Sequence, residues 1–304
     1  MFSIFPLEIE ETILDLLAED DELEGHSALK TCSLVCQAFL PICRKHIFRS
    51  IVLNDLNVVF SPTTHAFERL LLETPKIADY IRKLDYTILI ADLTSTSIQE
   101  SLKKITRLEF LTVRQAVRHP WSSIPIRPAL LHLLHLPTLT HFEVNSINDF
   151  VVSDLIPCVN LKFLDIGLCT TGAAETTFPA ALPEHSIQLN EFVTGIETPT
   201  TIMKLCTARR PDGRPIIDFG CLSKITLALE EPSESEASQE LFRRCHALTD
   251  VDISCKDMST VIIKISNPSL LSSLGSTECQ AQPRRYAAAI DGDSEAHRRG
   301  CHCL

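Results

Sequence analysis

The sequence predicts a mixed α/β protein, in which a small all-α unit of three helices precedes an irregular α/β repeat region built on a parallel sheet. Three observations support this fold class. Two wide apolar stripes at helical spacing fill the first fifty residues, a spacing of apolar-x-x-apolar-x-apolar recurs further along, and helix-like segments separate its copies. The expected domains are residues 1–50, residues 51–274 and a tail of residues 275–304.

Composition limits the function classes. The chain has 304 residues, of which 45% are hydrophobic, so it can form a sizeable core. No apolar run approaches the roughly 20 residues of a spanning helix, and the N-terminus lacks the pattern of a secretory signal. We therefore expect no membrane span and a cytoplasmic or nuclear location. The formal net charge of −11 argues against a nucleic-acid partner, which requires a concentrated basic surface.

The first helix is expected from Pro6 to about Ala18. Proline suits the first turn of a helix, where its missing N–H costs nothing, and the acidic residues that follow suit the positive end of the helix dipole. At 100° per residue, the apolar residues cover an arc of about 180°. They are Leu7, Ile9, Ile13, Leu14, Leu16 and Leu17.

Two further helices are predicted before residue 50. Ser27 can cap a helix that runs to about Leu40, and Pro41 can start a short third helix that reaches about Phe48. The second helix has only a narrow polar strip, so we expect it to be buried nearly all round. Three short helices can bury too little surface to cover stripes this wide. The remaining apolar surface must therefore be covered by the rest of the chain or by a second protein.

The cysteines favour packing over metal binding. Cys32, Cys36 and Cys43 fall on the apolar side of these helices, without a Cys-x-x-Cys pair or paired histidines. The chain holds 12 cysteines and shows no export signal, which favours free thiols over disulfides. We predict neither a metal site nor a cofactor.

The segments "FPLEIEETILDLL" and "ALKTCSLVCQAFLPICRKHIF" together resemble an F-box. The sequence departs from the usual pattern where Phe5 replaces Leu and Gln37 replaces a basic residue. The matching positions are Phe5, Pro6, Glu8, Ile9, Ile13, Leu14, Leu34, Val35, Cys36, Phe39 and Phe48.

This resemblance implies binding to the Skp adaptor of an SCF-type cullin–RING ubiquitin ligase. The surplus apolar area is an independent reason to expect a partner, whereas the alternative is a self-contained three-helix core. The residues that the resemblance assigns to the adaptor contact are Pro6, Leu7, Ile9, Ile13, Leu14, Leu34, Val35 and Phe39.

The remaining chain begins with a predicted strand at residues 49–55 and a helix that opens at Ser61 and Pro62. Further helices are expected at residues 97–105, 127–136, 149–156 and 238–245. The apolar triplets lie at Ile81/Leu84/Tyr86, Leu108/Leu111/Val113, Leu139/Phe142/Val144, Leu161/Leu164/Ile166, Leu222/Ile225/Leu227 and Leu248/Val251/Ile253, with a weaker copy at Leu189/Phe192.

The triplets start 22 to 33 residues apart, so the region resembles leucine-rich repeats, whose period is about 20–29 residues. In such repeats an Asn or Cys side chain normally hydrogen-bonds the backbone of the turn. Cys169 fits this position, but Ala116, Ile147 and Glu230 do not, so irregular repeats are expected. The resemblance implies a solenoid with a parallel sheet on its inner face.

Outward-facing strand positions of such a sheet are available for recognising a protein target, although a solvated face would look the same. The candidate surface consists of Glu109, Thr112, Thr140, Glu143, Lys162, Asp165, Lys224, Thr226, Asp250 and Asp252.

The tail of residues 275–304 has few large apolar residues and is predicted to be disordered. It ends in a formal C-a-a-X box at Cys301, but His302 and Cys303 are not the aliphatic residues that prenylation prefers, so lipidation is not favoured. No glycine-rich phosphate loop or catalytic signature appears, and the "GDS" of residues 292–294 lies in the tail.

The sequence thus favours a non-enzymatic adaptor that binds the Skp adaptor through the F-box-like helices and an unknown protein target through the repeats. The alternative is a leucine-rich-repeat scaffold without a ligase role, whose helices only cap the solenoid. A cytosolic hydrolase is the third reading, and it has no local motif in its favour.

Overall fold

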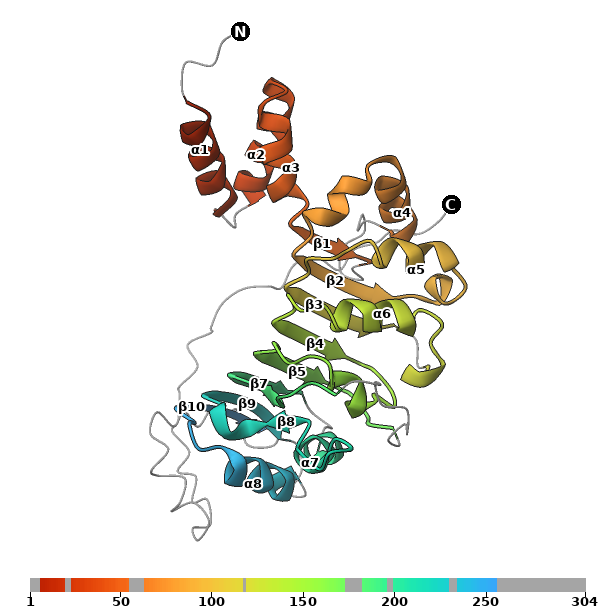
Figure 1. Cartoon of the computed structure of the whole chain (residues 1–304), viewed down its shortest axis with the longest axis vertical. Helices are drawn as coiled ribbons and strands as arrows, with labels where there is room; N and C mark the ends of the chain where they lie inside the picture. The colour runs from red at the N-terminus through yellow and green to blue at the C-terminus, as the bar shows by residue number, and fades with distance from the viewer. Residues whose placement is uncertain are drawn as a thin grey trace, which may run out of the picture. The chain divides into compact units, whose positions relative to one another are not determined.

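A computed structural model describes residues 6–19, 23–54, 63–116, 119–172, 182–195, 199–229 and 234–255. All of the described residues belong to one compact unit. The described ranges contain eight α-helices and an eight-stranded parallel sheet (Figure 1), which confirms the mixed α/β class. The predicted tail, with Cys301 and residues 292–294, lies outside the described residues.

Three helices open the described chain: α1 (Leu7–Glu19), α2 (Leu23–Val35) and α3 (Phe39–Ile47). The first follows Pro6 as predicted. The expected end of the second helix at Leu40 was wrong, because that residue belongs to α3. Pro41 lies in the first turn of α3, and a helix running unbroken through it would clash with the carbonyl group of Gln37, four residues earlier.

The helical trio α1–α3 has a core of its own. Leu14, Leu29 and Cys43 are buried together at its centre. Partly buried apolar side chains pack around them, all from the same three helices: Leu17, Ala18, Cys32, Phe39, Ile42 and Ile47. The expectation that the second helix is buried nearly all round was also wrong, since its last two residues are exposed.

The large sheet is parallel throughout, and its strands follow one another in chain order. Right-handed connections between parallel strands that advance in one direction all lie on the same face of the sheet. The strands are β1 (Ser50–Leu53), β2 (Lys83–Ile88), β3 (Phe110–Gln115), β4 (His141–Asn145), β5 (Phe163–Gly167), β7 (Glu191–Thr194), β9 (Lys224–Leu229) and β10 (Asp250–Cys255). A separate pair is formed by β6 (Ile187–Gln188) and β8 (Ile217–Asp218).

Each predicted apolar triplet coincides with one strand of the large sheet, including the weak copy at Leu189, which leads into β7. The middle residues of the triplets are register partners across the ladder and are all buried. The first residues of the triplets are buried as well. Since a strand exposes alternate residues to opposite faces, this pattern leaves the other face for polar and aromatic residues.

The connections contain α4 (Thr64–Glu73), η1 (Pro75–Asp79), η2 (Ile90–Leu93), α5 (Thr96–Leu102), η3 (Trp121–Ser123), α6 (Arg127–Leu134), η4 (Val152–Leu155), α7 (Pro199–Thr207), η5 (Phe219–Cys221) and α8 (Glu234–Arg244). Thr63 caps α4 through its side chain; the predicted opening at Ser61 and Pro62 lies outside the described residues. The helix expected at residues 149–156 is instead the 3-10 turn η4, and α7 was not predicted.

Cys169 satisfies a turn, as its position in the repeat predicts. Its thiol lies 3.1 Å from the carbonyl oxygen of Gly167 and 3.5 Å from that of Val144, on the neighbouring strand, and it is buried. The carbonyl oxygen of Gly167 also accepts from the backbone N–H of Ser146 at 2.9 Å, so the thiol adds a second, weaker donor where β5 ends.

Candidate functional site

The helical trio exposes a stripe of large apolar side chains on α1. Ile9 is 46% exposed, Ile13 49% and Leu16 62%. Their spacing of four and three residues places them within an arc of about 60° on the helix. At the end of α2, Leu34 is 86% exposed and Val35 68%. We refer to these five residues as the docking face.

Four of the residues assigned to the adaptor contact by resemblance, Ile9, Ile13, Leu34 and Val35, belong to the docking face. Pro6 is exposed beside it, and Phe39 is half-buried against the trio core. The side chain of Leu7 lies outside those described.

Leu14 is a correction to the expected contact residues. It is 3% exposed and packs in the trio core, so in this conformation it has no surface to offer a partner. On a helix it lies about 140° from Ile9, on the side that faces α2 and α3. Leu16 was not among the expected contact residues, although its spacing from Ile9 and Ile13 places it on the same exposed stripe.

The other large apolar residues exposed in the described ranges are scattered. Val52, Leu72, Ile90 and Leu168 lie on separate elements of the repeat region. Singly exposed apolar residues are ordinary on protein surfaces, whereas a contiguous stripe suggests an interaction site. Leu72 and Ile90 therefore serve as matched controls for changes in the docking face.

A second candidate surface is the sheet face, defined by two rows of register partners whose side chains alternate with the buried triplets. The first row is Lys83, Phe110, His141, Phe163, Glu191, Lys224 and Asp250; the second is Asp85, Thr112, Glu143, Asp165, Val193, Thr226 and Asp252.

Most of the predicted target-binding residues fall in these two rows, with two qualifications. Thr112 is only 5% exposed and donates a hydrogen bond of 3.1 Å to Glu143, so its hydroxyl is not available to a partner. Glu109, Thr140 and Lys162 precede their strands rather than lying within them. Their carbonyl oxygens accept hydrogen bonds from the start of the next strand, as the carbonyl of Lys162 does from Glu191.

An aromatic stack in the first row was not anticipated from the sequence. The rings of Phe110 and His141 lie 4.1 Å apart, and those of His141 and Phe163 lie 5.4 Å apart. The three residues come from adjacent strands at one register position. Burial lowers the pKa of His141, which favours the neutral ring that stacks between its neighbours.

Two carboxylates sit directly opposite each other beside this stack. Glu143 and Asp165 are register partners on neighbouring strands. Burial, and then the charge of Glu143, raise the pKa of Asp165 to about 6. The charge of Arg114, which forms an ion pair with Asp85, opposes this rise. A cationic side chain placed here would relieve the repulsion between the two carboxylates.

This arrangement predicts that Asp165→Asn raises the stability of the isolated protein at pH 7. A folded-state pKa of about 6 lies above the ordinary value of 3.8, so the folded state loses stability as pH rises from about 4 to about 6. Allowing for solvent screening, we expect the variant to gain about 1 kcal/mol at pH 7 and to lose this pH dependence. Urea unfolding at a series of pH values measures both effects.

Asp252→Asn is the matched control, because it removes the same charge from the same row but faces Thr226 rather than a carboxylate. An equal gain from both substitutions would show that the pair with Glu143 is not the cause.

The described cysteines are free thiols, and burial raises the pKa of those that lie in the core: Cys43, Cys158, Cys169 and Cys206. A raised pKa disfavours the nucleophilic thiolate. Among the described residues, no group of three His, Cys, Asp or Glu side chains could hold a metal ion. None of the helices within these ranges combines the length and the apolar character that crossing a bilayer requires.

Comparison with known proteins returned no match, either to a protein-family model or to a curated protein. Functional inference for this chain therefore depends on its residues and geometry.

Proposed function

We propose that this chain is a substrate-recruiting subunit of an SCF-type cullin–RING ubiquitin ligase, with an F-box formed by α1–α3 and leucine-rich-repeat-like units formed by the strands and their connections. One observation carries the proposal. The helical trio has its own buried core and still exposes the five large apolar residues of the docking face, four of which the F-box resemblance assigns to the Skp adaptor.

The docking face can supply a substantial part of the free energy of binding. Full burial of one large apolar side chain contributes about 1.5–3 kcal/mol. Since the five residues are between 46% and 86% exposed, covering them would contribute roughly 5 kcal/mol or more before the cost of association. The rest of the affinity would come from backbone and polar contacts around this face.

The sheet face is the proposed site for the target protein. Its second row contains the opposed carboxylates Glu143 and Asp165, and its first row contains the aromatic stack. Carboxylates neutralise a cation, and aromatic rings attract it through their π-electrons. A target that presents a Lys or Arg side chain to this face therefore fits it best.

A second candidate is a repeat scaffold without a ligase role, in which the trio only caps the sheet. The short connection between α3 and β1 favours it, because Ser50 starts the first strand three residues after α3 ends. In that case the docking face would have no dedicated partner.

Co-expression of the full chain with the Skp adaptor separates the two functions. We expect the two proteins to co-elute in size exclusion as a one-to-one complex, to which the cullin then adds. The scaffold function predicts that the folded chain elutes without the adaptor, and that result would contradict the proposal.

A further inference from the structure

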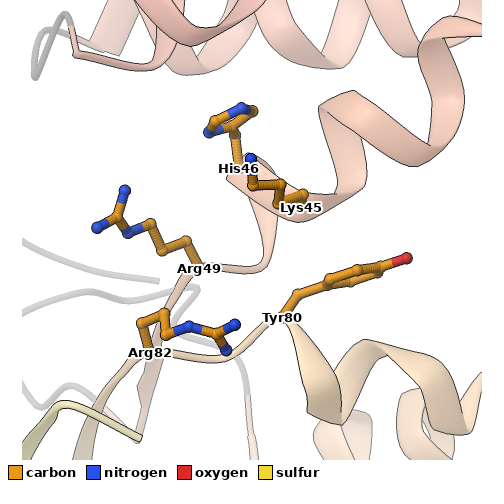
Figure 2. Close-up of a pocket in the computed structure, with 5 residues that line it drawn as sticks. All are labelled: Lys45, His46, Arg49, Tyr80 and Arg82. Carbon is orange, nitrogen blue, oxygen red and sulfur yellow. The ribbon is translucent and has the colours of Figure 1, made fainter. Parts of the chain in front are cut away.

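A pocket lined by basic residues lies where α3 leads into the first strands (Figure 2). Lys45 and His46 project from α3 on one side, and Tyr80 and Arg82 belong to the segment between η1 and β2 on the other. Arg49 stands between them. None of these residues belongs to the docking face or the sheet face.

Backbone hydrogen bonds hold the two walls together. The carbonyl oxygen of Arg49 accepts from the backbone N–H groups of Arg82, at 2.8 Å, and Lys83, at 2.9 Å. The N–H of Arg49 in turn donates to the carbonyl oxygen of His46 at 3.1 Å. The backbone that carries these side chains is therefore fixed before any ligand arrives, which lowers part of the entropic cost of binding.

The pocket contains more positive charge than its carboxylate neighbours neutralise. Nε of Arg82 lies 3.5 Å from Glu109, and one nitrogen of the same guanidinium donates to the carbonyl of Asp79. Lys45 and Arg49, by contrast, form no ion pair or side-chain hydrogen bond with any residue in the described ranges. Both side chains are exposed, so a ligand can reach them.

The other two lining residues add no donors for a ligand. Nε2 of His46 is buried and lies 2.7 Å from a carboxylate oxygen of Asp15. The hydroxyl of Tyr80 points away from the other lining side chains (Figure 2).

We propose that this pocket binds a phosphate group. A phosphate ester carries between one and two negative charges near neutral pH and three acceptor oxygens. The guanidinium of Arg49 offers paired donors that match two of these oxygens, and the ammonium group of Lys45 supplies a compact charge. The group can belong to a phosphorylated side chain of another protein or to a soluble phosphate ester, because both present the same oxyanion. This inference is independent of the ligase role.

Calorimetric titration of the full chain with inorganic phosphate, and then with pyrophosphate, tests the site at constant ionic strength. We expect saturable binding that Lys45→Glu combined with Arg49→Glu weakens by about tenfold or more, because two charge-assisted contacts become repulsive. Lys45→Gln with Arg49→Gln is the milder variant and should weaken binding in the same direction. Circular dichroism confirms that each variant is folded.

Lys104→Glu combined with Arg107→Glu is the matched control, since both residues are exposed, lie outside the pocket and give the same change in net charge. This control should bind phosphate within about twofold of the unmodified chain, because screening limits the reach of surface charges. Equal losses in the control and pocket variants, or no saturable binding by the unmodified chain, would overturn the proposal.

A phosphoserine peptide and its unphosphorylated twin distinguish the two sources of the group. Tighter binding of the phosphorylated peptide than of inorganic phosphate indicates a modified protein as the natural ligand. Equal affinities indicate a soluble ester.

Discussion

Replacing both Leu34 and Val35 by aspartate is expected to abolish binding of the Skp adaptor to this chain. The two side chains are 86% and 68% exposed, so the fold does not depend on their burial. In the complex, each aspartate would place a charge in an apolar interface without a counter-ion. The combined loss should exceed about 3 kcal/mol, or more than a hundredfold in affinity. Surface plasmon resonance with immobilised adaptor measures it.

Leu72→Asp with Ile90→Asp is the control for this variant. These residues are 75% and 69% exposed, so the control introduces the same charges at similarly exposed apolar sites away from the docking face. It should bind the adaptor like the unmodified chain. If both double variants lose binding equally while circular dichroism shows a retained fold, the docking face is not the contact.

Leu14→Ala is expected to destabilise the helical trio much more than Ile13→Ala, although the two residues are adjacent. Leu14 fills the trio core, so its truncation should cost about 2–5 kcal/mol and increase amide exchange throughout α1–α3. Ile13 is 49% exposed, and its truncation should change stability by less than about 0.5 kcal/mol. Hydrogen exchange followed by mass spectrometry resolves the trio from the repeats.

The same two variants should differ in binding as well. Ile13→Ala removes part of the docking face and should weaken the adaptor complex without loosening the helices. If Leu14→Ala leaves exchange in α1–α3 unchanged, the trio core described above is wrong.

The repeat region could be predicted from sequence because its signal is strictly local. In a strand, residues two apart share a face, so Leu164 and Ile166 had to be buried together. Leu161, just before the strand, is buried with them. Repetition of this pattern fixed the ladder and the parallel direction of its strands. Helix α7 escaped prediction because the segment of Pro199–Thr207 carries no such repeating pattern and begins with three residues that are poor helix formers.

The docking face was predicted only in part. Periodicity identified a stripe on α1 about 180° wide, but it could not tell which half would meet α2 and α3. The F-box resemblance assigned Leu14 to a partner although it lies in the core, and it left out Leu16 although that residue is exposed. Choosing between them requires knowing where Leu29 and Cys43 lie, which is tertiary information.

The basic pocket and the aromatic stack could not be found from sequence spacing. Arg49 and Arg82 are 33 residues apart and meet only because β1 and β2 pair in one particular register. Phe110, His141 and Phe163 likewise become neighbours only when three strands align. Sequence patterns predict the faces of single elements, whereas these sites arise from register between elements.

Calorimetric titration of the purified full chain with purified Skp adaptor tests the central claim most directly. We expect saturable one-to-one binding with a negative heat-capacity change, the signature of burying the apolar docking face. We also expect this binding to be lost in the Leu34→Asp, Val35→Asp double variant. No binding by the folded chain, or binding that this variant retains in full, would contradict the claim.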